Sequence, residues 1–237
     1  SSAIQSSEII VLALPSQSIR DVITKNKSSF NKNHIIVNVS KGIEIDTLMT
    51  VSEVINDVLD GQHKSVVTLS GPSHAEEVIS GHPTTLVAAS NDVQTAEIIQ
   101  NLFATEKLRT YLNRDIRGVE LGGSMKNVIA IAAGICDGIG YGDNSKAALM
   151  TRGMMEITRL GEAMGARVKT FRGLSGYGDL IVTCLSKHSR NRQLGQLIGE
   201  GKTLEDITSD MSMIAEGIFT AKSVHQLQLK HLSLIHI

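Results

Sequence analysis

The chain has 237 residues, of which 41% are hydrophobic and 20% charged, with a formal net charge of -1. This near-neutral balance gives no general attraction to nucleic acid. Cys136 and Cys184 are too few and too widely spaced for a disulfide framework, and the histidines show no metal-ligand spacing. No uninterrupted apolar run reaches the roughly 20 residues of a membrane span, and the N-terminus lacks a signal-peptide pattern. We therefore expect a cytoplasmic protein with no metal, no nucleic-acid partner and no membrane insertion.

In the first half, short apolar runs rich in β-branched residues alternate with helix-compatible segments. Their near-continuous apolarity is typical of strands that are covered on both faces. This alternation predicts a doubly wound α/β sheet of parallel or mixed strands. The predicted strands are residues 8–15, 34–40, 65–70, 84–90 and 108–113, and the predicted helices are 16–26, 46–61 and 92–104.

After about Arg117 the pattern changes to long helical segments separated by glycines. The predicted helices here are residues 118–140, 146–165, 179–185, 189–199 and 215–229. The second half is therefore predicted to be all-helical, joined directly to the last strand.

Polar groups follow three of the predicted strands, and ligands of open α/β sheets bind beyond the carboxyl ends of the strands. Pro15 ends the first strand, and Ser16 or Ser18 could cap the next helix or contact a ligand. Lys41 follows the second strand, where it could be solvated or could face a ligand.

The third strand ends in LSGPSHAEEV, which predicts a turn and a helix start. Ser73 and Glu76 fit a capping box, and the free backbone N–H groups of such a start could also bind an anion or a carbonyl. His74 is treated as an ordinary polar residue.

Lys126 stands inside the apolar stretch LGGSMKNVIAIAAG with no carboxylate three or four positions away. Small apolar neighbours would remove hydration from its ammonium group, lower its pKa and suit it to proton exchange near neutral pH. The alternative is a lysine that extends from the helix end into solvent.

Two later motifs carry further polar groups. In GYGDLIVTC, Asp179 could cap a helix, or Asp179 and Thr183 could point into one site from the same helical face. In SRNRQLG, Ser189 could cap the next helix, whose first turn then contains Arg190 and Arg192. Arginines in a first turn oppose the helix dipole unless an anion is present, which favours phosphate binding over a solvated basic turn.

With these residues in place, the sequence resembles the bacterial NAD(P)-dependent glycerol-3-phosphate dehydrogenases. The motifs that carry the resemblance are NVSKGIE, LSGPSHAEEV, RGVELGGSMKNVIAIAAGICDG, GYGDLIVTC, SRNRQLG and AEG, in the family's order over residues 8 to about 222. The resemblance implies an oxidoreductase that transfers a hydride between NAD(P)H and dihydroxyacetone phosphate, giving sn-glycerol 3-phosphate for phospholipid synthesis.

The resemblance also implies roles for individual residues. Lys126 would donate or accept the proton at the C2 oxygen of the substrate. The residues expected to bind the substrate are Lys41, Gly71, Ser73, Lys126, Asn127, Asp179, Thr183, Ser189, Arg190 and Asn191. The residues expected to bind the cofactor, NAD or NADP, are Lys41, Ala75, Arg190, Ile214 and Glu216.

The chain also departs from the family pattern, because the family's opening G-x-G-x-x-G turn does not occur in this sequence. We therefore expect an N-terminally truncated Rossmann-type dinucleotide-binding domain over residues 1–116. A helical substrate-binding domain over 117–230 and a possible non-native tail over 231–237 follow. The missing part would be about two βαβ units of roughly 30 residues each.

Two alternatives remain open at this point. One is another dehydrogenase of the same two-domain architecture, which would anchor its substrate without the SRNR turn. The other is an inactive fragment that cannot hold the cofactor. The preference for NAD or NADP is undetermined, and a homodimer is one possible assembly.

Overall fold

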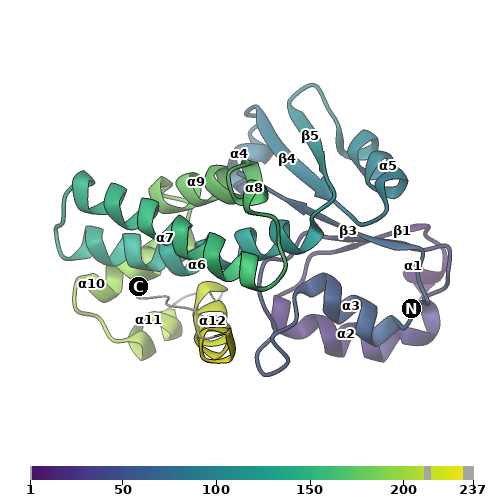
Figure 1. Cartoon of the computed structure of the whole chain (residues 1–237), viewed down its shortest axis with the longest axis horizontal. Helices are drawn as coiled ribbons and strands as arrows, with labels where there is room; N and C mark the ends of the chain where they lie inside the picture. The colour runs from purple at the N-terminus through teal and green to yellow at the C-terminus, as the bar shows by residue number, and fades with distance from the viewer. Residues whose placement is uncertain (1, 211–214, 232–237) are drawn as a thin grey trace.

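The computed structural model describes residues 2–210 and 215–231 of the chain. A five-stranded sheet lies at one end of the molecule and a group of helices at the other (Figure 1). Strands β1, β2 and β3 are parallel, β4 is antiparallel to β3, and β5 is parallel to β4. The sheet order follows the chain: β1 (Ile9–Leu12), β2 (Ile35–Asn38), β3 (Ser65–Ser70), β4 (Thr84–Ala89) and β5 (Leu108–Asn113). All five predicted strands form, and the mixed α/β sheet is confirmed.

Helices cover both faces of this sheet. In the sheet part they are α1 (Ser2–Gln5), α2 (Ile19–Asn26), α3 (Val51–Leu59), α4 (Ala75–Ile79) and α5 (Val93–Phe103), with short 3-10 turns at Ser16–Ser18 and Lys27–Ser29. Ile36 packs with the residues of α2 and α3 on one face, and its neighbour Val37 packs with α5 on the other. This alternation explains why the central strands β2 and β3 are largely apolar, since every residue of these two strands is buried.

The helical part contains α6 (Ile116–Gly138), α7 (Asp143–Ala163), α8 (Val168–Phe171), α9 (Asp179–Leu185), α10 (Arg190–Gly199), α11 (Leu204–Asp210) and α12 (Gly217–His231), with a π-helical turn at Leu174–Gly178. The predicted helices are present. The short helices α1, α8 and α11 and the π-turn were not predicted, because they span too few residues to show a helical period. The predicted boundary at residues 116 and 117 coincides with the start of α6, yet the division into domains stays a prediction.

Helix α6 joins the two parts of the molecule (Figure 1). Asp115 caps it by accepting a hydrogen bond from the Gly118 N–H at 3.0 Å. Val119 belongs to the core beneath the sheet, whereas Leu121 and Met125 belong to the core of the helical part. By length and composition α6 could cross a membrane, but most of its residues are buried inside the protein.

Glycines allow α6 and α10 to approach each other closely. A Cβ atom at Gly134 would lie 2.0 Å from the Arg192 carbonyl oxygen, and one at Gly195 would lie 1.9 Å from the Ile131 carbonyl oxygen. Neither position can therefore carry a side chain without separating the helices. This contact fixes the start of α10 relative to the middle of α6, where Lys126 lies.

Candidate active site

The buried lysine of α6 has its partners on α9. The Lys126 Nζ atom lies 2.5 Å from Asp179 Oδ1 and 2.6 Å from Thr183 Oγ1, and all three side chains are buried. The Thr183 hydroxyl donates to the Asp179 carbonyl oxygen at 2.6 Å, so its oxygen is free to accept from the ammonium. Asp179 and Thr183 do share one helical face and one site, as the sequence suggested. Gly178 is the N-cap of α9, so the alternative role of Asp179 as a helix cap is wrong.

A second lysine completes the cluster. Lys41, beyond the end of β2, places its Nζ atom 2.6 Å from Asp179 Oδ2 and 3.3 Å from the Gly71 carbonyl oxygen. Its side chain is 23% exposed, against 7% for Lys126 and 2% for Asp179. One carboxylate therefore bridges two ammonium groups, the inner one buried and the outer one open to solvent.

The pKa values follow from this arrangement. Burial lowers the pKa of Lys126 to about 8, against the support of the Asp179 charge, and the nearby Lys41 charge lowers it further. Burial alone would raise the pKa of Asp179, but the two ammonium charges outweigh it and hold that pKa below its usual value. Lys126 is therefore protonated at neutral pH and able to lose its proton only slightly above it.

The turn after β3 differs from the prediction. His74, not Ser73, is the N-cap of α4, and it makes no side-chain cap bond. The Ser73 hydroxyl donates instead to the Gly71 carbonyl oxygen at 3.2 Å, so the predicted capping box with Glu76 is wrong. Ala75 is the exposed first residue of α4.

His74, an ordinary polar residue by its sequence pattern, lies close to this cluster. Its ring is half-buried, and its centroid lies 6.2 Å from that of His188. Burial, together with the Lys126 charge, lowers the pKa of His74. No local sequence pattern predicts this lowered pKa, because His74 comes close to Lys126 only in the folded chain.

The start of α10 carries the predicted anion-binding residues. Ser189 caps the helix, accepting from the Arg192 N–H at 3.2 Å, as predicted. Arg192 itself pairs with Asp137 at 2.6 Å, and Asp137 also pairs with Lys146. The predicted need for an external anion is therefore wrong for Arg192, which pairs with a carboxylate of the chain itself.

Arg190 differs from Arg192 because it is exposed and has no ion pair within the described part of the chain. Beside it, Asn191 Oδ1 accepts from the Gly217 N–H at 2.9 Å. A Cβ atom on Gly217 would also lie 3.0 Å from the carbonyl oxygen of Asn127, the buried neighbour of Lys126. Gly217 therefore brings the α10 start close to the backbone that carries Lys126.

Glu216 connects α12 to the sheet part. Its Oε2 atom accepts from the Ser16 hydroxyl at 2.7 Å, which gives Ser16 a partner 200 residues away. Of the two predicted caps, Ser18 is the N-cap of α2, but its side chain makes no cap hydrogen bond. Burial raises the pKa of Glu216, whereas Ser16 and the charge of Arg190 act against that rise. Ile214, the other residue predicted near the cofactor from this segment, lies outside the described residues.

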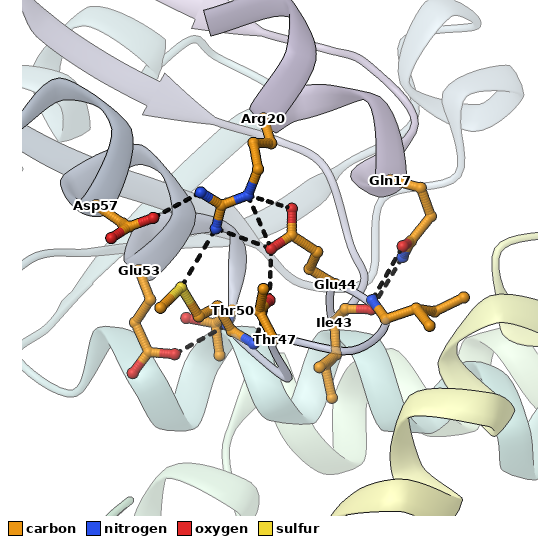
Figure 2. Close-up of polar contacts among 10 residues, drawn as sticks. Gln17, Arg20, Ile43, Glu44, Thr47, Thr50, Glu53 and Asp57 are labelled. Carbon is orange, nitrogen blue, oxygen red and sulfur yellow. Dashed lines mark hydrogen bonds and ion pairs between the residues drawn. The ribbon is translucent and has the colours of Figure 1, made fainter. Parts of the chain in front are cut away.

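The loop after Lys41 is held to the sheet part by a network of side chains (Figure 2). Arg20 donates from Nε and Nη2 to the Glu44 carboxylate and from Nη1 to Asp57 at 2.6 Å. Gln17 donates to the Ile43 carbonyl oxygen at 2.9 Å. The hydrogen bonds to the two carboxylates raise the pKa of the Arg20 guanidinium. These contacts fix the loop that begins directly behind Lys41.

Comparisons with known proteins find one family over both parts of the chain. Two family models match: "NAD-dependent glycerol-3-phosphate dehydrogenase N-terminus" over residues 1–96 and "NAD-dependent glycerol-3-phosphate dehydrogenase C-terminus" over residues 115–236. A glycerol-3-phosphate dehydrogenase [NAD(P)+] of Thermoanaerobacter sp. (strain X514) is 53% identical over 229 residues, which are 97% of this chain and 68% of that protein. One of Clostridium perfringens (strain SM101 / Type A) is 54% identical, over 96% of this chain and 68% of that protein.

A crystal structure is also similar. The glycerol-3-phosphate dehydrogenase of Coxiella burnetii superposes with a TM-score of 0.94 at 35% identity, covering 99% of this chain and 71% of that chain. The strands, the helical part and their relative placement are thus shared with a solved relative.

Proposed function

Because the chain belongs to the NAD-dependent glycerol-3-phosphate dehydrogenase family, we propose that it transfers a hydride between NAD(P)H and dihydroxyacetone phosphate. The product, sn-glycerol 3-phosphate, would serve phospholipid synthesis. The observation that carries the proposal is the buried Lys126, held by Asp179 and Thr183 beyond the carboxyl ends of the parallel strands.

Lys126 is the proton donor of the reduction in this proposal. Reduction of a carbonyl develops negative charge on its oxygen, and a positioned ammonium both stabilises that charge and supplies the proton. Asp179 and Thr183 accept two of the three Nζ hydrogens, which leaves one for the C2 oxygen. Lys41 adds a second positive charge, and Asn127, Gly71 and Ser73 complete the proposed wall around the substrate.

The substrate phosphate is assigned to the start of α10. Arg190 offers a guanidinium that has no ion pair among the described residues, and Ser189 and Asn191 hold the turn that presents it. A planar guanidinium binds phosphate through two parallel hydrogen bonds. Arg192 has no such role here, because Asp137 occupies it.

The described residues fit the reacting end of a nicotinamide nucleotide. The charge of Arg190 acts on Glu216, and Glu216 faces Ser16 in the turn after β1. Bound NAD(P)H would supply the hydride. Lys41, Ala75, Arg190 and Glu216 are the described residues proposed to hold it, whereas no motif in this sequence forms a glycine-rich turn for the pyrophosphate.

The proposal also covers the cellular location and the oligomeric state of the enzyme. We propose a cytoplasmic enzyme that acts on a small phosphorylated substrate and neither binds nucleic acid nor inserts into a membrane. The dehydrogenase family of the chain and the burial of α6 support this proposal. A homodimer is part of the proposal, and light scattering would test it.

The experiment measures oxidation of NADH and NADPH with dihydroxyacetone phosphate and with unphosphorylated dihydroxyacetone. We expect turnover of the phosphate ester and a much weaker reaction without the phosphate. Lys126→Met should abolish turnover while the fold remains intact by circular dichroism. Turnover of a hydroxy acid in place of the phosphate ester would contradict the proposal.

The phosphate assignment has its own variant. Arg190→Lys should raise KM for dihydroxyacetone phosphate by roughly tenfold, because an ammonium cannot form the paired hydrogen bonds. Arg192→Lys, in the same helical turn, is the matched control and should leave KM nearly unchanged. Equal effects of the two substitutions would contradict the assignment.

A further inference from the structure

A buried carboxylate on α6 lies outside the chemistry proposed above. Glu120 is 5% exposed and lies six residues before Lys126. Its Oε1 atom accepts from the Ser52 N–H at 2.9 Å, from Thr68 Oγ1 at 3.0 Å and from Asn38 Nδ2 at 3.1 Å, and its Oε2 atom accepts from Ser52 Oγ at 2.5 Å. Glu120 thus ties α6 to β2, β3 and the first turn of α3.

The contact with Asn38 leads directly to the outer lysine. Asn38 Oδ1 accepts from the Ser40 N–H at 2.9 Å, and its Nδ2 atom donates to the Ser40 carbonyl oxygen at 3.2 Å. Both backbone groups of Ser40 are therefore held by the side chain that Glu120 holds. Lys41 is the next residue, so this chain of contacts sets the direction in which Lys41 leaves the strand.

The other end of Lys41 also lies against α6. A Cβ atom at Gly123 would be 3.7 Å from both Cγ and Cδ of Lys41, so the lysine stem passes over this glycine. Gly123 lies one turn beyond Glu120 on the same helix. The lysine is thus positioned relative to α6 at its backbone and along its side chain before it reaches Asp179.

We propose that Glu120 is a positioning residue that, through Asn38, sets Lys41 against Asp179 and thereby fixes the spacing of the two active-site ammonium groups. The inference rests on the proposed function, because it assigns Lys41 and Lys126 to one substrate site. Helix α6 carries both Glu120 and Lys126. The hydrogen bond from Asn38 of β2 to Glu120 therefore links the position of Lys41 to the helix that carries Lys126.

A purely structural role for Glu120 makes a different prediction. Loss of a buried hydrogen-bonded network would lower the free energy of unfolding and nothing else. Displacement of Lys41 would in addition remove a positive charge from beside Lys126, and that charge lowers the pKa of Lys126. The pKa of Lys126 and KM therefore separate positioning from general stabilisation.

The test uses Glu120→Ala and Asn38→Ala, with Glu120→Gln as the conservative variant. The glutamine can keep its Oε1 contacts and donate to Ser52 Oγ, which as a hydroxyl can also accept. We expect both alanine variants to raise KM for dihydroxyacetone phosphate by roughly tenfold, with a smaller change in kcat, since a small misplacement of a positioned group has effects of this size. Glu120→Gln should keep KM close to that of the parent chain.

Asp115→Asn is the matched control. Asp115 is a buried carboxylate at the start of the same helix, and it accepts from Gly118, Arg167 and Thr170. Its loss should lower stability without moving KM. The proposal is overturned if Asp115→Asn reproduces the change in KM, or if Asn38→Ala changes stability alone.

A second readout does not depend on turnover. Titration of the lysine ε-methylene signals by carbon NMR would report the pKa of Lys126 in the chain without substrate. We expect this pKa to rise in Asn38→Ala and to stay in place in Asp115→Asn. If the parent chain does not turn over dihydroxyacetone phosphate, the proposed function fails, yet this titration still decides the positioning role. If Glu120→Ala does not fold, Asn38→Ala decides it.

Discussion

At the residue scale, the site depends on one lysine whose charge is opposed by burial and supported by a single carboxylate. The pKa of Lys126 lies at about 8, well below its ordinary value of 10.5, because burial outweighs the attraction of Asp179. An amine of this kind can release its proton under mild conditions, which an exposed lysine cannot. The same lysine would be a costly residue in a helix core without that task.

The first prediction concerns pH. Since the reduction needs protonated Lys126, kcat/KM for dihydroxyacetone phosphate should fall as the pH rises through about 8, and the reverse oxidation should rise over the same range. Asp179→Asn should shift this fall in kcat/KM to lower pH, because the charge that stabilises the Lys126 ammonium is lost. Steady-state rates across the pH range would measure both effects.

Thr183→Ser is the control for this substitution. The serine hydroxyl can still accept from Lys126, and the charge of Asp179 is unchanged. The fall in kcat/KM should therefore occur at the same pH as in the parent chain. If the pH dependence of kcat/KM is unchanged in Asp179→Asn, the group whose titration controls the rate is not Lys126.

At the scale of elements, the contact between α6 and α10 decides where the proposed phosphate site lies. The glycines of both helices face a carbonyl oxygen of the partner helix, so the two backbones touch without intervening side chains. Ser189, Arg190 and Asn191 stand at the end of α10 that this contact orients. The position of the proposed anion site is thus a property of helix packing as well as of its own residues.

The second prediction follows from this contact. In Gly195→Ala, the new methyl group would lie 1.9 Å from the Ile131 carbonyl oxygen, so α10 must shift. We expect a loss of about 1–3 kcal/mol in the free energy of unfolding and a higher KM for the phosphorylated substrate. Denaturant unfolding and steady-state kinetics would measure these changes.

Gly142→Ala is the matched substitution, because nothing lies within 4 Å of its Cβ position. It should change stability by less than about 0.5 kcal/mol and leave KM unchanged. An unaltered KM in Gly195→Ala, with the expected loss of stability, would contradict the role of helix packing in placing the phosphate site.

At the scale of the whole molecule, the sheet part and the helical part share buried groups at the loop after Lys41. Ile43 belongs by sequence to the sheet part, yet its fully buried side chain packs in the core of the helical part. Its carbonyl oxygen accepts from Gln17 and, at 2.9 Å, from Ser223 of α12. Arg20 holds the next residue, Glu44, back against the sheet part (Figure 2).

The third prediction tests this connection. Ile43→Ala should lower the free energy of unfolding by about 2–5 kcal/mol, the usual cost of such a cavity in a core. Because the residue belongs to both parts, the sheet and the helices should lose stability together. Unfolding followed by circular dichroism and by hydrogen exchange of each part would show this. Ile79→Ala, at a side chain that is 86% exposed, should have almost no effect.

Much of the fold was predictable because it depends on local patterns. Apolar runs rich in β-branched residues indicated the first four strands, and helical periods indicated the long helices. The small apolar neighbours of Lys126 indicated a low pKa, and the order of the motifs identified the family. Ser189 was correctly predicted to cap α10, because an N-cap depends only on residues three positions apart.

The tertiary structure alone decided which charges meet. Asp179 is 53 residues from Lys126 and 138 from Lys41, and Arg192 meets Asp137 on another helix. Local sequence patterns therefore indicate no partner for Lys126 and an external anion for Arg192. Electrostatic interactions and hydrogen bonds act across space between groups of any sequence separation. The residue types, and the candidates for the chemistry, can be read from the chain, whereas their partners and pKa values belong to the fold.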